Sequence, residues 1–242
     1  MGRVVFVAKT VAALLLAAFV TACTADGAGS GAGTGSGSGA ARSAGSDAAT
    51  RLLAAAARGD VDAARAALDD GADVEARDDR RRTPLLLAVT GDHVDVARLL
   101  LDRDADPDAV DAQQDTPWLV TGVTGSVAMA EVLLPADPDL TLVNRYGGTS
   151  LIPASERGHV DYVRRVVQTD IDVNHVNNLG WTALLEAVIL GDGGPAHQQI
   201  VRILLDAGAD PTIADKDGVT ALKHARIKGF REIAAALGSR AG

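Results

Sequence analysis

Two patterns of apolar residues alternate along this chain, and Thr83 to Asp106 shows both of them. Leu85 to Ala88 form a short continuous apolar run, which is typical of a small buried helix. Val94, Ala97, Leu100 and Leu101 then follow at helical spacing and predict a second helix with one buried face. Asp92 and His93 separate the two runs. The stretch therefore predicts a pair of short helices joined by a turn.

The same stretch returns along the chain at a fixed period. Thr50, Thr83, Thr116, Thr149 and Thr182 stand 33 residues apart, and Thr220 follows after 38. The aspartates at 73, 106, 139, 172 and 210 keep the same register. A period of this length indicates stacked helical repeats. The extra five residues, Gly191 to Pro195, fall between the two helices of one repeat, where we expect them to bulge from the surface without shifting the register.

Each period contains its own signals for where a helix starts and stops. Thr83 can cap a helix by accepting a backbone N–H bond, and Pro84 suits the first helical position, where a missing donor costs nothing. The aspartate-rich segment after each second helix predicts a turn, because aspartate side chains hydrogen-bond to nearby backbone N–H groups. Pro153 and Pro135 lie inside predicted helices, so we expect the third and fourth repeats to be the least regular.

These motifs resemble the ankyrin repeat. Its pattern is carried by Thr83-Pro84-Leu85, Gly158-His159-Val160, Gly208-Ala209-Asp210 and Asp215 to Thr220. The resemblance implies an all-α solenoid of six helix-turn-helix repeats joined by short β-hairpin fingers. It covers residues 47–242, with repeats at about 50–82, 83–115, 116–148, 149–181, 182–219 and 220–242. The sixth repeat carries Lys223, Arg226, Lys228 and Arg231, which are expected to form a polar end.

The first 46 residues have a different composition and predict export. Arg3 and Lys9 precede an apolar run, Val11 to Val20, that is too short to span a bilayer, so residues 1–22 are interpreted as a signal peptide. Val20-Thr21-Ala22-Cys23 resembles the lipobox of bacterial lipoproteins, in which the cysteine is lipidated; an ordinary signal peptide that contains a cysteine is the alternative. After Cys23, residues 24–46 are mostly Gly, Ser, Ala and Thr and are interpreted as a linker. We therefore expect an extracytoplasmic protein that is anchored to a bacterial membrane through Cys23.

Charge and cysteine content exclude several classes of function. Without residues 1–22 the chain keeps 21 basic and 32 acidic residues, a net charge of −11, which disfavours binding to nucleic acid. Cys23 is the only cysteine, so a disulfide framework and a cysteine-based zinc site are excluded. No P-loop, nucleophile-elbow or zinc-protease motif occurs. We expect neither an enzyme nor a cofactor.

Two clusters invite a metal interpretation. His93, His159 and His197 occupy equivalent repeat positions, where the resemblance implies hydrogen bonds between turns; helices pack about 10 Å apart, too far for these side chains to share an ion. The second cluster is an acidic run that favours calcium only weakly, because Pro107 stands where an EF-hand loop needs glycine. It consists of Asp102, Asp104, Asp106, Asp108, Asp111 and Asp115. No metal site is predicted.

Aromatic and apolar residues in the predicted fingers and helix ends indicate a partner site instead. Tyr146 and Trp181 lie in fingers, where the resemblance implies contact with partners, although Trp181 could instead fold back as a staple over the next helix. Tyr and Trp are enriched at binding hot spots, and clustered apolar groups on an acidic surface suggest a contact patch. The predicted partner-binding residues are Tyr146, Trp181, Leu179, Arg145, Asn178, Val123, Ile189 and Leu190.

The function that we predict is a protein-protein interaction module, secreted and lipid-anchored, which works as a monomer. An alternative is an accessory factor that stabilises or delivers an extracytoplasmic enzyme, such as a peroxide-detoxifying one. A third hypothesis is capture of calcium or a small ligand at the acidic run.

Overall fold

The structure, a computed structural model, describes residues 38–240. Contacts divide the chain into a unit of residues 1–44, nearly all of which lies outside the described residues, and a compact unit that begins at Gly45. Twelve α-helices and one 3-10 turn occupy the described part. Within it, no helix is long and apolar enough to cross a membrane. The predicted signal peptide and Cys23 lie outside the described residues.

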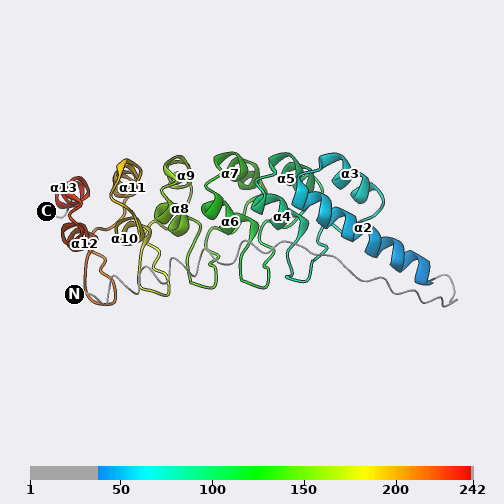
Figure 1. Cartoon of the computed structure of the whole chain (residues 1–242), viewed down its shortest axis with the longest axis horizontal. Helices are drawn as coiled ribbons and strands as arrows, with labels where there is room; N and C mark the ends of the chain where they lie inside the picture. The colour runs from blue at the N-terminus through cyan, green and yellow to red at the C-terminus, as the bar shows by residue number, and fades with distance from the viewer. Residues whose placement is uncertain (1–37, 241–242) are drawn as a thin grey trace. The chain divides into compact units, whose positions relative to one another are not determined.

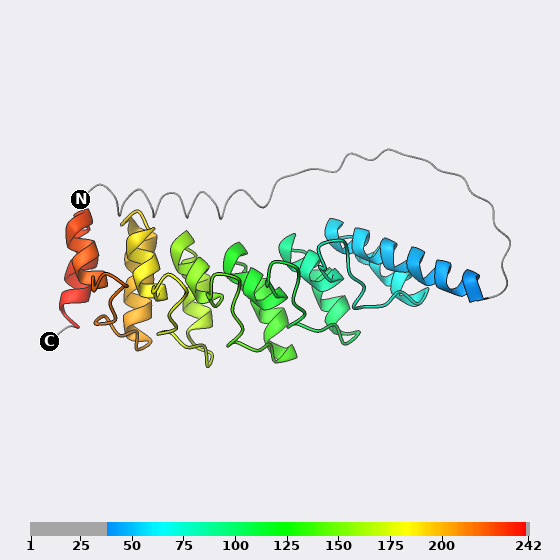
Figure 2. The same cartoon turned by 90° about the horizontal axis from the view of Figure 1, so that it is seen from below.

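The helices form six antiparallel pairs, which confirms the predicted all-α solenoid of six repeats. Figure 1 shows the first helices of the pairs in one layer, the second helices in another, and the connecting fingers below the first layer. Figure 2 shows the pairs side by side in one row. The pairs are α2 (Ser38–Arg58) with α3 (Val61–Asp69), α4 (Pro84–Thr90) with α5 (Val94–Leu101), α6 (Pro117–Thr124) with α7 (Val127–Leu133) and the turn η1 (Leu134–Ala136), α8 (Leu151–Arg157) with α9 (Val160–Val166), α10 (Ala183–Ile189) with α11 (Pro195–Asp206), and α12 (Ala221–Lys228) with α13 (Arg231–Gly238).

The helix α2 begins earlier than the sequence pattern predicted. It starts at Ser38, inside the range interpreted as a linker, so residues 38–46 are helical rather than linker. Alanines recur among the glycines and serines of this segment, and alanine has the highest helix propensity of any residue. The rest of the predicted linker, residues 24–37, lies outside the described residues.

The inner helix α4 is apolar nearly all round because other elements cover it on several sides. In α4, every residue from Pro84 to Val89 is buried. The outer helices are amphipathic instead: α5 buries Val96, Ala97, Leu99 and Leu100 and exposes Asp95 and Arg98. Neighbouring inner helices approach closely at Gly122, where an added Cβ would lie 1.9 Å from the Ser150 carbonyl oxygen. Glycine is therefore required at this crossing.

Threonine caps start four of the inner helices, as predicted. The side chains of Thr83, Thr116, Thr182 and Thr220 each accept a hydrogen bond from the backbone N–H three residues later, at 3.2–3.4 Å. Thr149 does not, and α8 starts one residue later than its equivalents. The cause is Pro153, which has no N–H to donate to the Thr149 carbonyl, whereas Val120 makes the equivalent bond to Thr116. The predicted irregularity of the fourth repeat is thus confirmed.

The five-residue insertion lengthens both a loop and a helix. Pro195 takes the first position of α11, which has 12 residues where α9 has 7. The loop before it is tied to the sixth repeat, because the Lys228 ammonium donates to the carbonyls of Val188, Ile189 and Gly191 at 2.7–3.1 Å. A cation at a helix C-terminus is favourably placed against the helix dipole. The insertion keeps the register, as predicted, but it is held in place rather than bulging freely.

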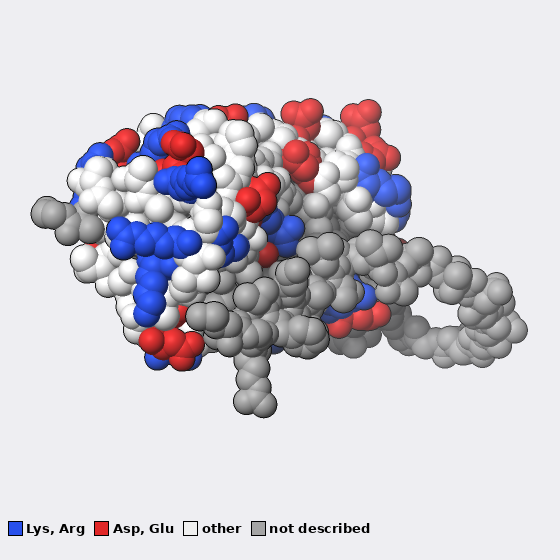
Figure 3. Space-filling model, turned by 60° about the vertical axis from the view of Figure 1, so that its left-hand side comes forward, with Lys and Arg blue, Asp and Glu red and all other residues white. Residues whose placement is uncertain are grey.

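The sixth repeat ends the described stack with cations at positions that are apolar in the earlier repeats. Leu86, Leu119, Ile152 and Leu185 stand three residues after their threonines and are at most 6% exposed. Lys223 takes this position in the sixth repeat and is exposed. Figure 3 shows Lys and Arg gathered on this end of the molecule. The polar end is confirmed for Lys223, Arg226 and Arg231, whereas the Lys228 ammonium turns inward to α10.

The caps provide a matched test. Thr116 and Thr149 are both buried, but only the Thr116 hydroxyl caps a helix. We expect Thr116→Val to lower the free energy of unfolding by about 1 kcal/mol or more, because it leaves a buried N–H without an acceptor. Thr149→Val should leave it unchanged or raise it, because that hydroxyl has no hydrogen-bond partner to lose within residues 38–240. Urea unfolding followed by circular dichroism measures both; equal losses would contradict the capping role.

Candidate partner-binding face

Each finger is a five-residue turn held by the side chain at its start. The residues Asp78, Asp111, Asn144, Asn177 and Asp215 do this in successive fingers. In every case the side-chain Oδ1 accepts from the backbone N–H groups two and four residues later, at 2.7–3.1 Å. The backbone N–H of the same residue donates to the carbonyl four residues on. In residues 38–240 only the last finger carries a β-bridge, between Ala214 and Thr220, so the fingers are tight turns more than paired strands.

Hydrogen bonds also join neighbouring fingers. The N–H of Ala112 donates to the Arg80 carbonyl, and the N–H of Asn178 donates to the Tyr146 carbonyl, both at 2.9 Å. The Asn178 carbonyl in turn accepts from the Lys216 ammonium at 2.6 Å. The fingers therefore present a surface whose backbone is fixed before any partner arrives.

The predicted residues Arg145 and Tyr146 lie together on the third finger. The Arg145 guanidinium lies 4.7 Å from the centre of the Tyr146 ring and also donates to Gln113 on the preceding finger. Both side chains are half-buried. Asn178 is exposed on the next finger, and Leu179 beside it is half-buried. The structure thus brings four of the predicted residues onto two adjacent fingers.

Trp181 is placed differently from Tyr146. Its side chain is partly buried and packs against the apolar core, which is the arrangement expected of a staple. Ile189 also packs against the core from the end of α10. Val123, near the end of α6, and Leu190, directly after α10, are half-buried. These four residues keep only part of their surface available to a partner.

Sequence reasoning missed a row of exposed valines. Val110, Val143 and Val176 are 39%, 39% and 46% exposed. Each one immediately precedes the residue that holds its finger, so the three valines occupy the same place on successive fingers. Their spacing of 33 residues was visible in the sequence, but their exposure depends on the fold. We call these three residues the valine row.

A buried carboxyl group, also missed, lies where α10 meets the fingers. Glu186 is 4% exposed, and its Oε1 accepts from the Asn177 Nδ2 at 2.9 Å. Its Oε2 has no hydrogen-bond partner among the described residues. Burial, reinforced by the nearby charge of Glu156, raises the pKa of Glu186 from 4.5 to about 8. Burial likewise raises the pKa of Glu156 on α8.

In the two clusters considered as metal sites, the side chains make hydrogen bonds with backbone groups. The Nε2 atoms of His93, His159 and His197 lie 2.9–3.2 Å from carbonyl oxygens of the preceding repeat. In the acidic run, Asp106 accepts from the N–H of Asp108, and Asp108 accepts from the N–H of Asp139. Within residues 38–240 no group of three or more His, Cys, Asp or Glu side chains is arranged to hold a metal ion.

A family model described as ankyrin repeats in three copies matches residues 35–111 and 119–215. The chain belongs to the ankyrin repeat family. Ankyrin repeats are in general protein-protein interaction modules, and their fold is typically a scaffold without enzymatic activity. The fingers and inner helices described above are therefore the part of this ankyrin repeat protein where a partner site is to be sought.

Solved ankyrin repeat structures are similar over most of the chain. An ankyrin repeat domain from Acinetobacter baumannii AYE is 46% identical with a TM-score of 0.75, covering 78% of this chain and 96% of that domain. A second ankyrin repeat protein is 38% identical with a TM-score of 0.75, covering 78% of this chain and 97% of the other. The ankyrin repeat domain of Bcl-3, a member of the IkappaB family, is 25% identical with a TM-score of 0.70 and covers 79% of this chain and 86% of that one.

A curated relative matches over a shorter segment. YahD of Escherichia coli K12, described as an ankyrin repeat protein, is 53% identical over 49 residues. The match covers 20% of this chain and 24% of YahD, so the chain spans about a quarter of the length of this relative.

The raised pKa of Glu186 predicts how stability changes with pH. The native state holds the proton up to about pH 8, whereas an unfolded chain releases it near pH 4.5, so this group lowers the free energy of unfolding as the pH rises from about 4.5 to 8. At roughly 1.4 kcal/mol per pKa unit the loss amounts to a few kcal/mol. We expect Glu186→Gln to flatten this slope, whereas Glu232→Gln, at an exposed position on α13, should not. Urea unfolding at pH 5.5 and 8.5 decides; an unchanged slope in Glu186→Gln would contradict the assignment.

Proposed function

We propose that this chain is an extracytoplasmic, lipid-anchored ankyrin repeat protein that binds a partner protein through its fingers and inner helices. The observation that carries the proposal is the valine row, which repeats exposed apolar side chains on consecutive fingers of a strongly acidic molecule. Large apolar side chains gathered on a protein surface mark interaction sites. The proposed site combines the valine row with Arg145, Tyr146 and Asn178.

The rigidity of the fingers supports this site. Each of the five turns repeats the same pattern of side-chain and backbone hydrogen bonds, and further bonds join neighbouring fingers. A surface that is ordered before binding loses less conformational entropy when a partner docks. Arg145 and Tyr146 add a cation and an aromatic ring, both of which are enriched at binding hot spots.

Lipid anchoring rests on the sequence alone. The lipobox-like segment ending in Cys23 follows a short apolar run, and Cys23 is the only cysteine in the chain. A lipid on this residue would hold the repeats near a membrane surface and raise the local concentration of partners located there. The protein is proposed to act as a monomer. The side chains on its fingers are proposed to determine which partner it binds.

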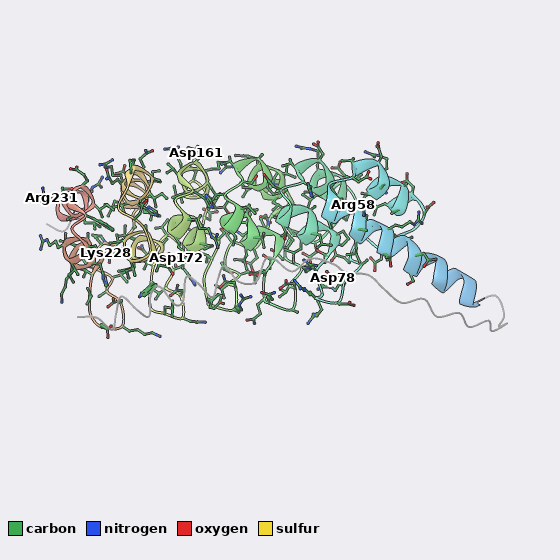
Figure 4. All side chains as sticks on the ribbon, viewed as in Figure 1. Arg58, Asp78, Asp161, Asp172, Lys228 and Arg231 are labelled. Atoms are coloured by element: carbon green, nitrogen blue, oxygen red, sulfur yellow. The ribbon has the colours of Figure 1, made fainter. Side chains whose placement is uncertain are left out.

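Partner capture tests the site. Crosslinking the protein in its native host, followed by affinity purification, should recover one dominant partner. Val143→Asp should lower recovery strongly, with a loss of about 2 kcal/mol or more in binding, because a charge would be forced into an apolar contact. Its melting temperature should stay unchanged, because Val143 is exposed. Asp161→Ala, on the outer helix α9 and away from the fingers (Figure 4), is the matched control.

Trp181→Ala tests the role of Trp181 in packing. Because Trp181 packs against the core, we expect this variant to lower the melting temperature as well as partner recovery. If Val143→Asp leaves recovery intact, the valine row is not the partner site.

The anchor has its own test. Cys23→Ala should move the protein from the membrane fraction to the soluble fraction, because the substitution removes the only thiol that can carry the lipid. Fractionation followed by immunoblotting measures this. A Cys23→Ala protein that still sediments with membranes as the parent does would rule out anchoring by this route.

A further inference from the structure

The last inner helix, α12, carries basic residues and no acidic ones. Lys223, Arg226 and Lys228 lie on it, and its eight residues include no Asp or Glu. Arg231 begins α13, which packs against α12. All four residues are exposed, and Figure 3 shows Lys and Arg gathered on this end of the molecule. The chain without residues 1–22 has 21 basic and 32 acidic residues, so this end is opposite in charge to the molecule as a whole.

Three of these four cations have no acidic partner. No ion pair within residues 46–240 includes Lys223, Arg226 or Arg231. The Lys228 ammonium bonds to carbonyl oxygens of the preceding repeat and lies 4.7 Å from the centre of the Phe230 ring. Because no neighbouring carboxylate cancels their charge, the cations give this end of the stack a positive field.

An exposed isoleucine stands among these cations. Ile227 is 70% exposed, more than any residue of the valine row. It follows Arg226 directly, and it lies four residues after Lys223, which places both on one side of the helix. A polar end to a solenoid accounts for the cations but not for Ile227. The repeat pattern does not require it either, since Thr90 and Glu156 take the same place in the second and fourth repeats.

An apolar side chain surrounded by cations suits a surface of anionic lipid. Lys and Arg are attracted to anionic headgroups, and an exposed isoleucine can enter the boundary between headgroups and acyl chains. A nucleic acid would use the cations alone, and the net negative charge of the chain disfavours it. Of these two anionic partners, the lipid surface is the one that uses both kinds of side chain.

We propose that the terminal patch, made by Lys223, Arg226, Ile227 and Arg231, docks on a membrane that contains anionic phospholipid. The proposal rests on the proposed function, because the lipid on Cys23 would bring the patch to a membrane. A few cations and one isoleucine bind a membrane weakly by themselves. A tethered protein meets the membrane at a high local concentration, so a weak contact becomes effective.

The docked patch would orient the stack. Cys23 precedes the first repeat, whereas α12 belongs to the sixth, at the other end of the row in Figure 1. Both attachments can be made at once when the row lies along the membrane. The acidic repeats between them need not touch the surface, because salt screens their repulsion beyond about 10 Å. The lipid alone would leave this orientation free.

A fluorescent label at position 227 tests the contact. In the lipidated protein the Cys23 sulfur is occupied, so Ile227→Cys supplies the one thiol that an environment-sensitive NBD dye can label. The protein is purified from its host and reconstituted into vesicles of phosphatidylcholine, alone or with phosphatidylglycerol in equal parts. We expect the emission to rise about twofold or more and to shift to the blue only in the anionic vesicles, because the dye enters the lipid there. The same dye at Asp161→Cys on α9 should not respond.

Charge reversal shows whether the patch itself makes the contact. Lys223→Glu combined with Arg226→Glu should abolish the response at position 227. Arg98→Glu combined with Arg202→Glu changes the net charge equally, on the exposed surface of α5 and α11, and should preserve it. Circular dichroism checks the fold. A response that survives the first pair, or that both pairs lose equally, overturns the proposal. A response that appears without vesicles and grows with protein concentration overturns it in favour of contact between copies.

Mass spectrometry separates failure of this inference from failure of the proposed anchor. A lipidated protein takes up one dye, whereas a protein without the lipid takes up two and shows that the anchor is wrong. In that case the label is placed in the Cys23→Ala chain and mixed with the same vesicles. A response at position 227 then supports the patch without the anchor, and no response overturns it. Val143→Asp tests the finger face, which takes no part in the dye measurement.

Discussion

The structure depends on one constraint, which is that no helix pair of this chain can bury its own apolar surface. The inner helix α4 is buried along almost its whole length only because α5, the neighbouring inner helix α6 and the turns around it cover it. Stability therefore comes from contacts between repeats, as in other linear repeat proteins. Close approach of the inner helices, with Gly122 against the Ser150 carbonyl, makes those contacts possible. Where the described stack ends, the positions that would face a further repeat carry Lys223 and Arg226 instead.

The helices pack against those of neighbouring repeats, so the side chains of the fingers are available to contact a partner. Asp or Asn at the start of each finger satisfies three backbone groups of its own turn, so the fingers need little burial to be ordered. Side chains on them, such as Val143 and Tyr146, can therefore vary without loss of the fold. Because the helices supply the stability and the fingers do not, the valine row can remain exposed on a stable, acidic protein.

Glu186 marks a place where a buried polar group costs stability. Glu186 is buried on an inner helix whose other buried residues are apolar, and its Oε2 has no hydrogen-bond partner among the described residues, so the fold is less stable there than it would be with a leucine. The equivalent residues in the second and third repeats, Leu87 and Val120, are apolar. A cost of this kind is commonly found at sites that bind something.

The amino-acid sequence by itself determined the repeat architecture of residues 47–240. Threonine caps, aspartate turns and the two apolar patterns act within about 33 residues, so their effect can be derived without knowing the neighbours. An irregular start of α8 could also be predicted from the sequence, because Pro153 has no backbone N–H in any structure. The helical state of Ser38 to Ser46 was not, since its glycines and serines favour a linker by composition.

Only the tertiary structure decided which of these residues can meet a partner. Val176 stands directly before the finger that ends at Trp181, yet the valine is exposed and the tryptophan packs on the core. The Lys228 ammonium and the Glu186 carboxyl group owe their environments to helices of neighbouring repeats. Exposure and protonation are properties of what surrounds a side chain, and in a solenoid much of those surroundings comes from residues thirty or more positions away.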